Sequence, residues 1–162
     1  MSDTLDILEN ITYQELNEGD SATFTRTLTE DELVLFAAVS GDVNPVHLDS
    51  EFAAESMFKE RIAHGMWSGS LISAALATVM PGPGTIYLEQ SLAFKRPVRL
   101  DDTLTVTLTV ARKERRNRVV FQCEVSNQAG DKVVTGEAKV VAPTEKISLR
   151  KPRLPKITIE NR

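Results

Sequence analysis

The 162-residue chain has one cysteine, Cys123, and only two histidines, His47 and His64. A single cysteine excludes a disulfide within the chain. It lies within a run of alternating apolar residues, where we expect a small core side chain. Structural zinc sites take four ligands, mostly nitrogen or sulfur, and the two histidines have no third such ligand near them in the sequence. We therefore expect no metal site.

Neither an excess of one charge nor a long apolar run is present. The 19 Lys and Arg residues against 23 Asp and Glu residues give a formal net charge of -4. This balance does not indicate nucleic acid or an acidic membrane surface as a partner. The longest apolar run is interrupted by serines and glycines and is too short to span a membrane. The chain begins without a charged-then-apolar leader, and we expect a cytoplasmic protein with no membrane partner.

The periodicity of apolar residues predicts an α+β fold. Residues 64–80 carry no charge and contain many alanines, serines and glycines, which predicts a slender, largely buried helix. The sequence Pro-Gly-Pro-Gly at residues 81–84 stops it. Residues 104–110 and 119–125 then alternate between apolar and polar, as strands with one buried face do. Short turns between such strands make them antiparallel. We expect an antiparallel sheet packed around one long central helix.

The length fits a single domain, which we assign to residues 1–141. The first 12 residues are expected to form a short outer helix or a flexible arm. Gly136 interrupts the last predicted strand and indicates a bulge or a close approach of another segment. Residues 142–162 are basic, contain three prolines and show no structural period. We interpret them as an extended or disordered tail or a linker.

The most informative stretch is Ser40-Gly41-Asp42-Val43-Asn44-Pro45-Val46-His47-Leu48-Asp49. A capping box at Thr29 and Glu32 begins a helix that leads into this stretch. Gly41 can end that helix, and Pro45 disfavours helical geometry at Asn44. We therefore expect a loop that turns the side chains of Asp42 and His47 toward one point. A carboxylate and an imidazole so placed can hold one water and move protons to and from it.

Together with Ile62-Ala63-His64-Gly65-Met66, this stretch resembles the MaoC-like, (R)-specific enoyl-CoA hydratases. The resemblance extends from about Thr29 to Val141. It implies the hotdog fold and reversible (R)-specific hydration of trans-2-enoyl-CoA to (R)-3-hydroxyacyl-CoA. It also implies a homodimer or a higher homo-oligomer with an acyl-CoA thioester as substrate. No cofactor is implied beyond the coenzyme A of the substrate.

The resemblance also implies roles for individual residues. Asp42 and His47 match the catalytic acid–base pair of the family, and Asn44 matches an asparagine that shapes the loop. Gly65 matches the glycine whose N–H faces the thioester oxygen, a role that suits the unpaired N–H groups of a helix start. Ser73 matches a serine that hydrogen-bonds the catalytic carboxylate. For His64 we favour capping or packing at the start of the helix.

Several alternatives stay open on the sequence alone. Lys95 and Arg96 are candidates for contact with the phosphates of coenzyme A. The basic cluster at residues 112–118 is interpreted as a solvated turn, but it leaves open a 3-hydroxyacyl dehydratase acting on an acidic acyl-carrier protein. A non-catalytic acyl-CoA-binding hotdog subunit is a further alternative, against which the intact Asp42 and His47 argue. A thioesterase of the same fold is less favoured for the same reason.

Overall fold

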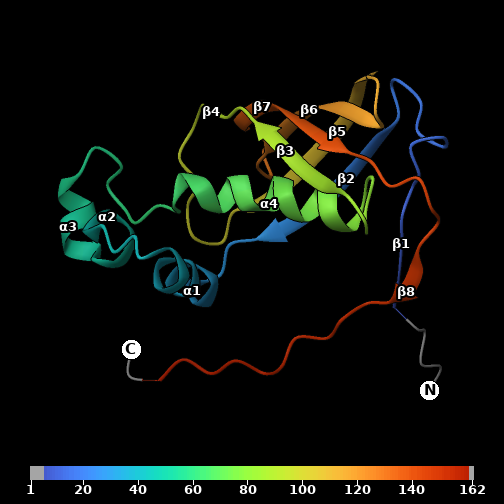
Figure 1. The fold of residues 1–162 in the computed structure, drawn as a ribbon. Helices are drawn as coiled ribbons and strands as arrows, with labels where there is room; N and C mark the ends of the chain where they lie inside the picture. The colour runs from blue at the N-terminus through green and yellow to red at the C-terminus, as the bar shows by residue number, and fades with distance from the viewer. Residues whose placement is uncertain (1–5, 161–162) are drawn as a thin grey trace.

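The computed structural model describes residues 6–160 and contains one main antiparallel sheet that curves around one helix (Figure 1). The strand order is β2-β5-β6-β7-β3, and the short strand β4 also pairs with β7. The strands of this sheet are β2 (Ser21–Thr27), β3 (Ile86–Gln90), β4 (Ala93–Phe94), β5 (Thr103–Lys113), β6 (Arg118–Ser126) and β7 (Lys132–Val141). The helices are α1 (Glu30–Ser40), α2 (Pro45–Leu48), α3 (Ser50–Glu55) and the central α4 (Gly65–Thr78). The predicted α+β arrangement is confirmed.

The core lies between α4 and the concave face of the sheet. Alternate residues of β5, from Leu104 to Val110, are buried, as are Phe121 and Cys123 of β6. From the helix, Ile72 and Leu76 are also buried. Removing this apolar surface from water is the main stabilising term, at about 25 cal/mol per Å².

Small residues allow the chain to pass close to the sheet and the helix at two points. A Cβ atom on Gly69 of α4 would lie 3.1 Å from the Leu92 side chain. A Cβ atom on Gly136 of β7 would lie 1.9 Å from the backbone oxygen of Ser91, so no larger residue fits there. The register of β6 and β7 shifts between Val125 and Ser126 rather than at Gly136. Of the two predictions for Gly136, a close approach is therefore the one observed.

Helix α1 delivers the chain to the informative stretch, as predicted. The Thr29 hydroxyl accepts from the N–H of Glu32 while the Glu32 carboxylate accepts from the N–H of Thr29. Gly41 then ends the helix with φ of 77°, a left-handed conformation that suits glycine. The position of Asp42 is thus fixed by caps at both ends of α1.

The two chain ends differ from the prediction. Strand β1 (Ile7–Glu9) pairs antiparallel with β8 (Ser148–Arg150), so part of the expected tail has regular structure. These two strands are too short for an alternation of apolar residues to predict them, and each is stabilised by pairing with a segment distant in the sequence. After β8 the chain has no regular secondary structure through residue 160 and runs outside the main sheet (Figure 1). The rest of the arm or helix expected near the N-terminus (residues 1–5) and the end of the tail (161–162) lie outside the described residues.

One edge of the sheet carries exposed apolar side chains. Among residues 6–160, strand β3 pairs with β7 on one side only, and Ile86, Tyr87 and Leu88 are 39–58% exposed. Exposed apolar edges promote association with another chain. Among the described residues no helix is long and apolar enough to cross a membrane.

Candidate active site

Asp42 and His47 face one another across the turn between α1 and α2. The distance from His47 Nε2 to Asp42 Oδ2 is 3.8 Å. The other carboxylate oxygen, Oδ1, accepts from the N–H of Asn44 at 3.1 Å. The His47 side chain is 10% exposed and that of Asp42 is 51% exposed. One end of the pair is thus held by the protein and the other is open to a small molecule.

The hydrogen bond of His47 to the backbone determines which ring nitrogen carries the proton. His47 Nδ1 lies 2.8 Å from the carbonyl oxygen of Ile62. A carbonyl oxygen only accepts, so Nδ1 is the protonated nitrogen and Nε2 of the neutral ring has a lone pair directed toward Asp42. Two acceptors 3.8 Å apart suit a water molecule that donates to both, at about 2.8 Å from each.

His47 lies on a short helix rather than in the predicted loop. Asn44 is the N-cap of α2 and its side-chain oxygen accepts from the N–H of Val46 at 3.2 Å. Pro45 occupies the first helical position, where its missing N–H leaves no hydrogen bond unmade. The prediction that Pro45 keeps Asn44 out of helical geometry is confirmed, since Asn44 has φ of -52° and ψ of 125°, whereas the loop predicted around His47 is a short helix. The expected role of Asn44 in shaping this segment agrees with its cap hydrogen bond.

His64 joins the two halves of the pair. Its Nε2 lies 2.9 Å from the carbonyl oxygen of Asp42. Its ring stacks on that of His47, with centroids 3.8 Å apart and an interplanar angle of 27°. Although His64 is the N-cap residue of α4, its side chain makes no capping hydrogen bond. Of the two expectations for His64, packing is confirmed and capping is wrong.

Gly65 begins α4 beside a pocket of about 310 Å³ whose lining includes His64, Phe94, Lys95 and Arg96. Gly65 is exposed, and a Cβ atom there would lie 2.9 Å from the Phe94 ring. The first N–H groups of a helix have no intrahelical acceptor, and His64 provides no side-chain cap. Neither Lys95 nor Arg96 forms an ion pair within residues 6–160. The pocket therefore combines a helix start with two available cations.

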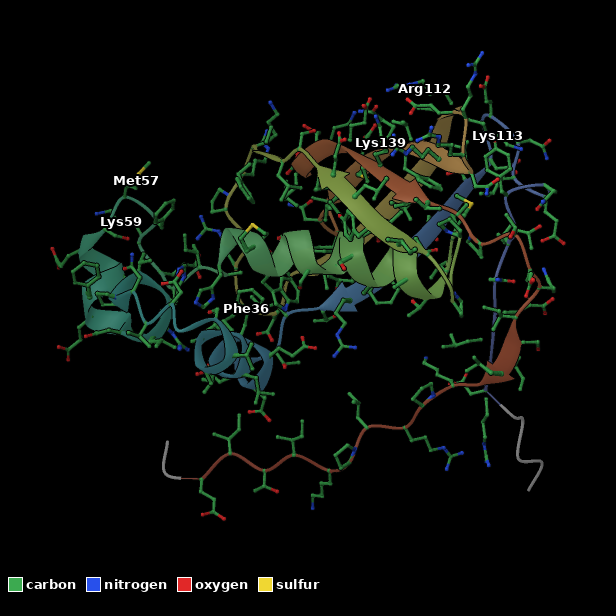
Figure 2. All side chains as sticks on the ribbon, in the orientation of Figure 1. Phe36, Met57, Lys59, Arg112, Lys113 and Lys139 are labelled. Atoms are coloured by element: carbon green, nitrogen blue, oxygen red, sulfur yellow. The ribbon has the colours of Figure 1, made fainter. Side chains whose placement is uncertain are left out.

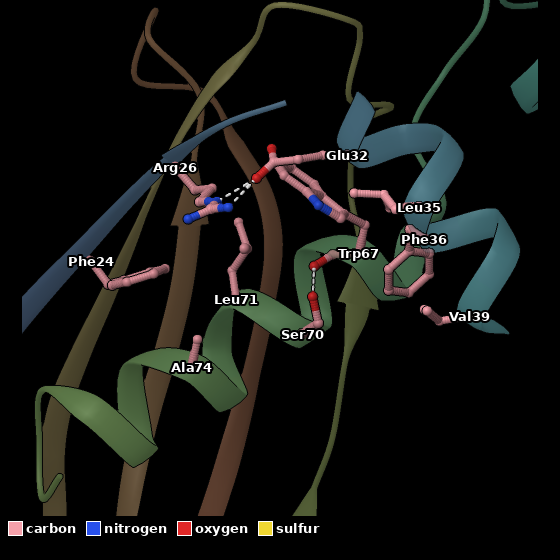
Figure 3. A pocket seen from close by; sticks show the side chains of 10 residues that line it. All are labelled: Phe24, Arg26, Glu32, Leu35, Phe36, Val39, Trp67, Ser70, Leu71 and Ala74. Carbon is pink, nitrogen blue, oxygen red and sulfur yellow. Dashed lines mark hydrogen bonds and ion pairs between the residues drawn. The ribbon is translucent and has the colours of Figure 1, made fainter. Parts of the chain in front are cut away.

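Ser73 is not joined to Asp42 by a hydrogen bond within the described chain. It lines a different pocket, of about 470 Å³, with Gly69, Ser70 and Leu92. A third pocket, of about 320 Å³, lies between α1, β2 and α4 and is mostly apolar, with an Arg26–Glu32 ion pair and Ser70 in its wall (Figure 3). Phe36 lines both pockets, and its ring centroid is 5.1 Å from that of His64. Phe36 thus connects this apolar space to His64, whose ring stacks on that of His47.

Tertiary structure brings three residues of metal-ligating types together, which the sequence spacing did not indicate. Ligand atoms of Asp42, His47 and His64 lie within 4.8 Å of one another. An imidazole binds a metal in the plane of its ring. Because the two rings are stacked, an ion in the plane of one lies outside the plane of the other. The hydrogen bonds of both rings to carbonyl groups also oppose reorientation. This geometry is a poor fit to a metal.

Burial explains why Cys123 does not compete as a nucleophile. Burial raises the pKa of the Cys123 thiol to about 11, and only the thiolate is strongly nucleophilic. Partial burial raises the pKa of Tyr87 to about 12, and its hydroxyl donates to the Gln90 side chain.

The basic cluster lies far from the acid–base pair. Arg112 and Lys113 are at the β5–β6 end of the sheet, well separated from Phe36 on α1 (Figure 2). Arg112 forms ion pairs with Glu114 and Glu137. Lys113 lies over the ring of Tyr13, 4.2 Å from its centroid. The two glutamates offset the charge of Arg112.

A curved antiparallel sheet around one helix defines a hotdog protein. An acid–base pair beside the start of that helix is the kind of site that a hydro-lyase requires. Residues 14–141 match the family model described as MaoC like domain, and the chain belongs to that family. R-Hydratase PhaJ1 from Pseudomonas aeruginosa, in its unliganded structure, superposes with a TM-score of 0.92 at 57% identity, covering 95% of this chain and 99% of that one.

Two curated relatives bear the name (R)-specific enoyl-CoA hydratase. The protein from Rhodospirillum rubrum is 44% identical over 131 residues, which cover 81% of this chain and 91% of the relative. The protein from Aeromonas caviae is 41% identical over 131 residues, covering 80% and 98% respectively. The hotdog fold predicted from the resemblance is confirmed by these similarities.

The cap at Asn44 generates a prediction. Asn44→Ala removes the acceptor for the N–H of Val46 and should cost about 1 kcal/mol of unfolding free energy. Because α2 carries His47, turnover should also fall, by roughly 10-fold, through misplacement of the ring. Urea unfolding and kcat measure the two effects. Asn44→Ser, which keeps a capping oxygen, is the matched control and should retain most of both. If Asn44→Ala has the same kcat as wild type, the cap at Asn44 does not position His47 for turnover.

Proposed function

We propose that the protein is an enoyl-CoA hydratase that adds water to trans-2-enoyl-CoA to give (R)-3-hydroxyacyl-CoA, and that it catalyses the reverse reaction. The observation that carries this proposal is the Asp42–His47 pair, separated by 3.8 Å next to the open start of α4. The names of the similar hydratases support the same substrate class.

In the proposed mechanism Asp42 and His47 hold one water and act as a unit. The pair takes one proton from the water as its oxygen attacks the β-carbon of the substrate. A proton then passes from the pair to the α-carbon, so the pair returns to its original protonation state. General acid–base catalysis of this kind contributes about 10²- to 10⁴-fold. Because one water serves both carbons, its OH and H add to the same face of the double bond.

Negative charge develops on the thioester oxygen while the β-carbon is attacked. We assign the N–H of Gly65 as its hydrogen-bond donor, aided by the positive end of the α4 dipole. The absence of a side chain at Gly65 leaves the N–H accessible beside Phe94. Lys95 and Arg96, on the same pocket, are proposed to attract the phosphates of coenzyme A.

The reaction involves no change of oxidation state in the protein, so the proposal includes no cofactor beyond the coenzyme A of the substrate. The net charge of -4 and the unpaired Cys123 agree with a cytoplasmic enzyme. A carrier-protein thioester is not favoured as the substrate, because the basic cluster lies far from the acid–base pair (Figure 2) and Arg112 within it is paired with acidic side chains. Comparing crotonyl-CoA with the crotonyl thioester of a carrier protein separates the two substrates.

The acid–base pair generates the central prediction. With crotonyl-CoA, loss of the enoyl-thioester absorbance should yield the (R) alcohol. Asp42→Asn, which cannot take up a proton, and His47→Gln, which cannot shuttle one, should each lower kcat by on the order of 10² or more. The double variant should be scarcely slower than the slower single variant, since residues that act as a unit are non-additive.

Chiral analysis of the product and kcat for the three variants test this mechanism. An (S) product, or losses that multiply in the double variant, would contradict the shared water. Absence of turnover by wild type on enoyl-CoA substrates of any acyl length would refute the proposed function itself.

The thioester contact generates a second prediction. Gly65→Pro removes the N–H but is tolerated in the first turn of a helix, and should lower kcat by about 10²-fold. Gly65→Ala is the matched control, because it adds a Cβ against the Phe94 ring and keeps the N–H. The alanine variant should lose less than the proline variant. Equal kcat values in the two folded variants would exclude the N–H from the mechanism.

We also propose that the protein forms a homodimer through β3. This edge strand exposes Tyr87 and Leu88, and Met66 of α4 is 56% exposed. Antiparallel pairing of β3 with its copy would close the interface by two-fold symmetry and cover these side chains. The second copy would also lie against the pocket lined by Ser73 and Leu88. The resemblance implies a hydrogen bond from Ser73 to Asp42, which the described residues do not form. That hydrogen bond would require the dimer to change the surroundings of Ser73.

Sedimentation tests the dimer. Wild type at micromolar concentration should sediment as a dimer or a larger assembly, and Leu88→Lys should shift it toward monomer by placing a charge at the edge. Met57→Lys is the control, because Met57 is 85% exposed but lies in the segment after α3, at the end of the molecule well away from β3 (Figure 2). An active wild-type monomer, or equal dissociation in both variants, would contradict an interface at β3.

A further inference from the structure

The surroundings of His64 are unusual for a residue that only packs. His64 is 3% exposed, and its Nδ1 atom is buried without a hydrogen-bond partner among the described residues. An unpaired buried acceptor destabilises the folded state and calls for an explanation. A phenylalanine would fill similar space without this cost, so packing alone does not account for a histidine here.

Besides a tilted contact with the Phe36 ring, the His64 ring makes two contacts with the acid–base pair. The carbonyl oxygen of Asp42, 2.9 Å from Nε2, can only accept, so Nε2 carries a proton and donates to it. The face of the ring lies on the ring of His47, at a centroid distance of 3.8 Å. One side chain thus limits the movement of the backbone that carries the carboxylate and of the imidazole that faces it.

We propose that His64 is a positioning residue for the hydration reaction, holding Asp42 through its hydrogen bond and His47 through stacking. This inference rests on the proposed function. It assigns His64 no contact with substrate and no proton transfer. Displacement of a reacting group by about 1 Å costs roughly 10²-fold in rate, so loss of either contact should lower kcat more than it changes KM.

Two variants separate the contacts. His64→Phe keeps a ring against His47 but loses the donor to Asp42, whereas His64→Gln keeps an N–H donor and loses the ring. Each should lower kcat by about 10-fold or more, with a smaller change in KM. The unfolding midpoint of His64→Phe should equal or exceed that of wild type, because the unpaired Nδ1 is gone. Ile72→Val, a buried change elsewhere on α4, is the control and should lower the midpoint without lowering kcat.

Nuclear magnetic resonance of ¹⁵N-histidine gives a readout that does not need turnover. Since the chain has only two histidines, the spectrum of each variant at position 64 contains the signals of His47 only. Wild type should show His47 protonated at Nδ1 and His64 at Nε2. In His64→Gln the His47 signals should shift and broaden as the stacked ring is lost, while His64→Phe should preserve them.

The results distinguish this inference from the proposed function. Wild-type kcat in either folded variant, or His47 signals unchanged in His64→Gln, would overturn the positioning role. A fall in kcat that follows a fall in unfolding midpoint in both variants would also overturn it, by showing a structural role. If wild type does not turn over enoyl-CoA, the proposed function fails, and the His47 signals still test the contact.

Discussion

The site depends on hydrogen bonds that tie the segment around α2 to the segment before α4. The carbonyl oxygens of Ile62 and Asp42 each accept from a histidine ring, and the N–H of Ile62 donates to Val46. The N–H of Ala63 donates in turn to the carbonyl of Val98, which leads into the sheet. Two short segments with little core of their own thereby share the rigidity of the sheet.

These hydrogen bonds also determine which nitrogen of each histidine ring is protonated. Each carbonyl accepts only, so each fixes the protonated nitrogen of one ring. The lone pair of His47 Nε2 then faces the carboxylate, and the imidazole and carboxylate are both acceptors toward the same water. A reversed ring would present N–H to Asp42 instead, and the two groups would bond to each other rather than to water.

The slender helix links the fold to the proposed reaction. Because Gly69 lies close to Leu92, α4 sits deep in the curve of the sheet, and its first turn emerges beside the acid–base pair. His64 uses its side chain on that pair and leaves the helix start uncapped. The missing cap lowers stability slightly, and it leaves backbone donors available where the proposed thioester oxygen lies.

Local sequence determined much of this protein. The capping box of α1, the left-handed Gly41, the uncharged helix and the alternation of β5 and β6 each follow from a few neighbouring residues, and each was predicted. The pairing of Asp42 with His47 was also predictable, because both lie within one turn of chain. Tertiary structure decided the rest. Strand β8 depends on a partner about 140 residues away in sequence. The stacking of His64 on His47 joins residues separated by 17 positions, with α3 between them. No pattern among neighbouring residues predicts this contact, because it forms only when the two segments pack together in the folded chain.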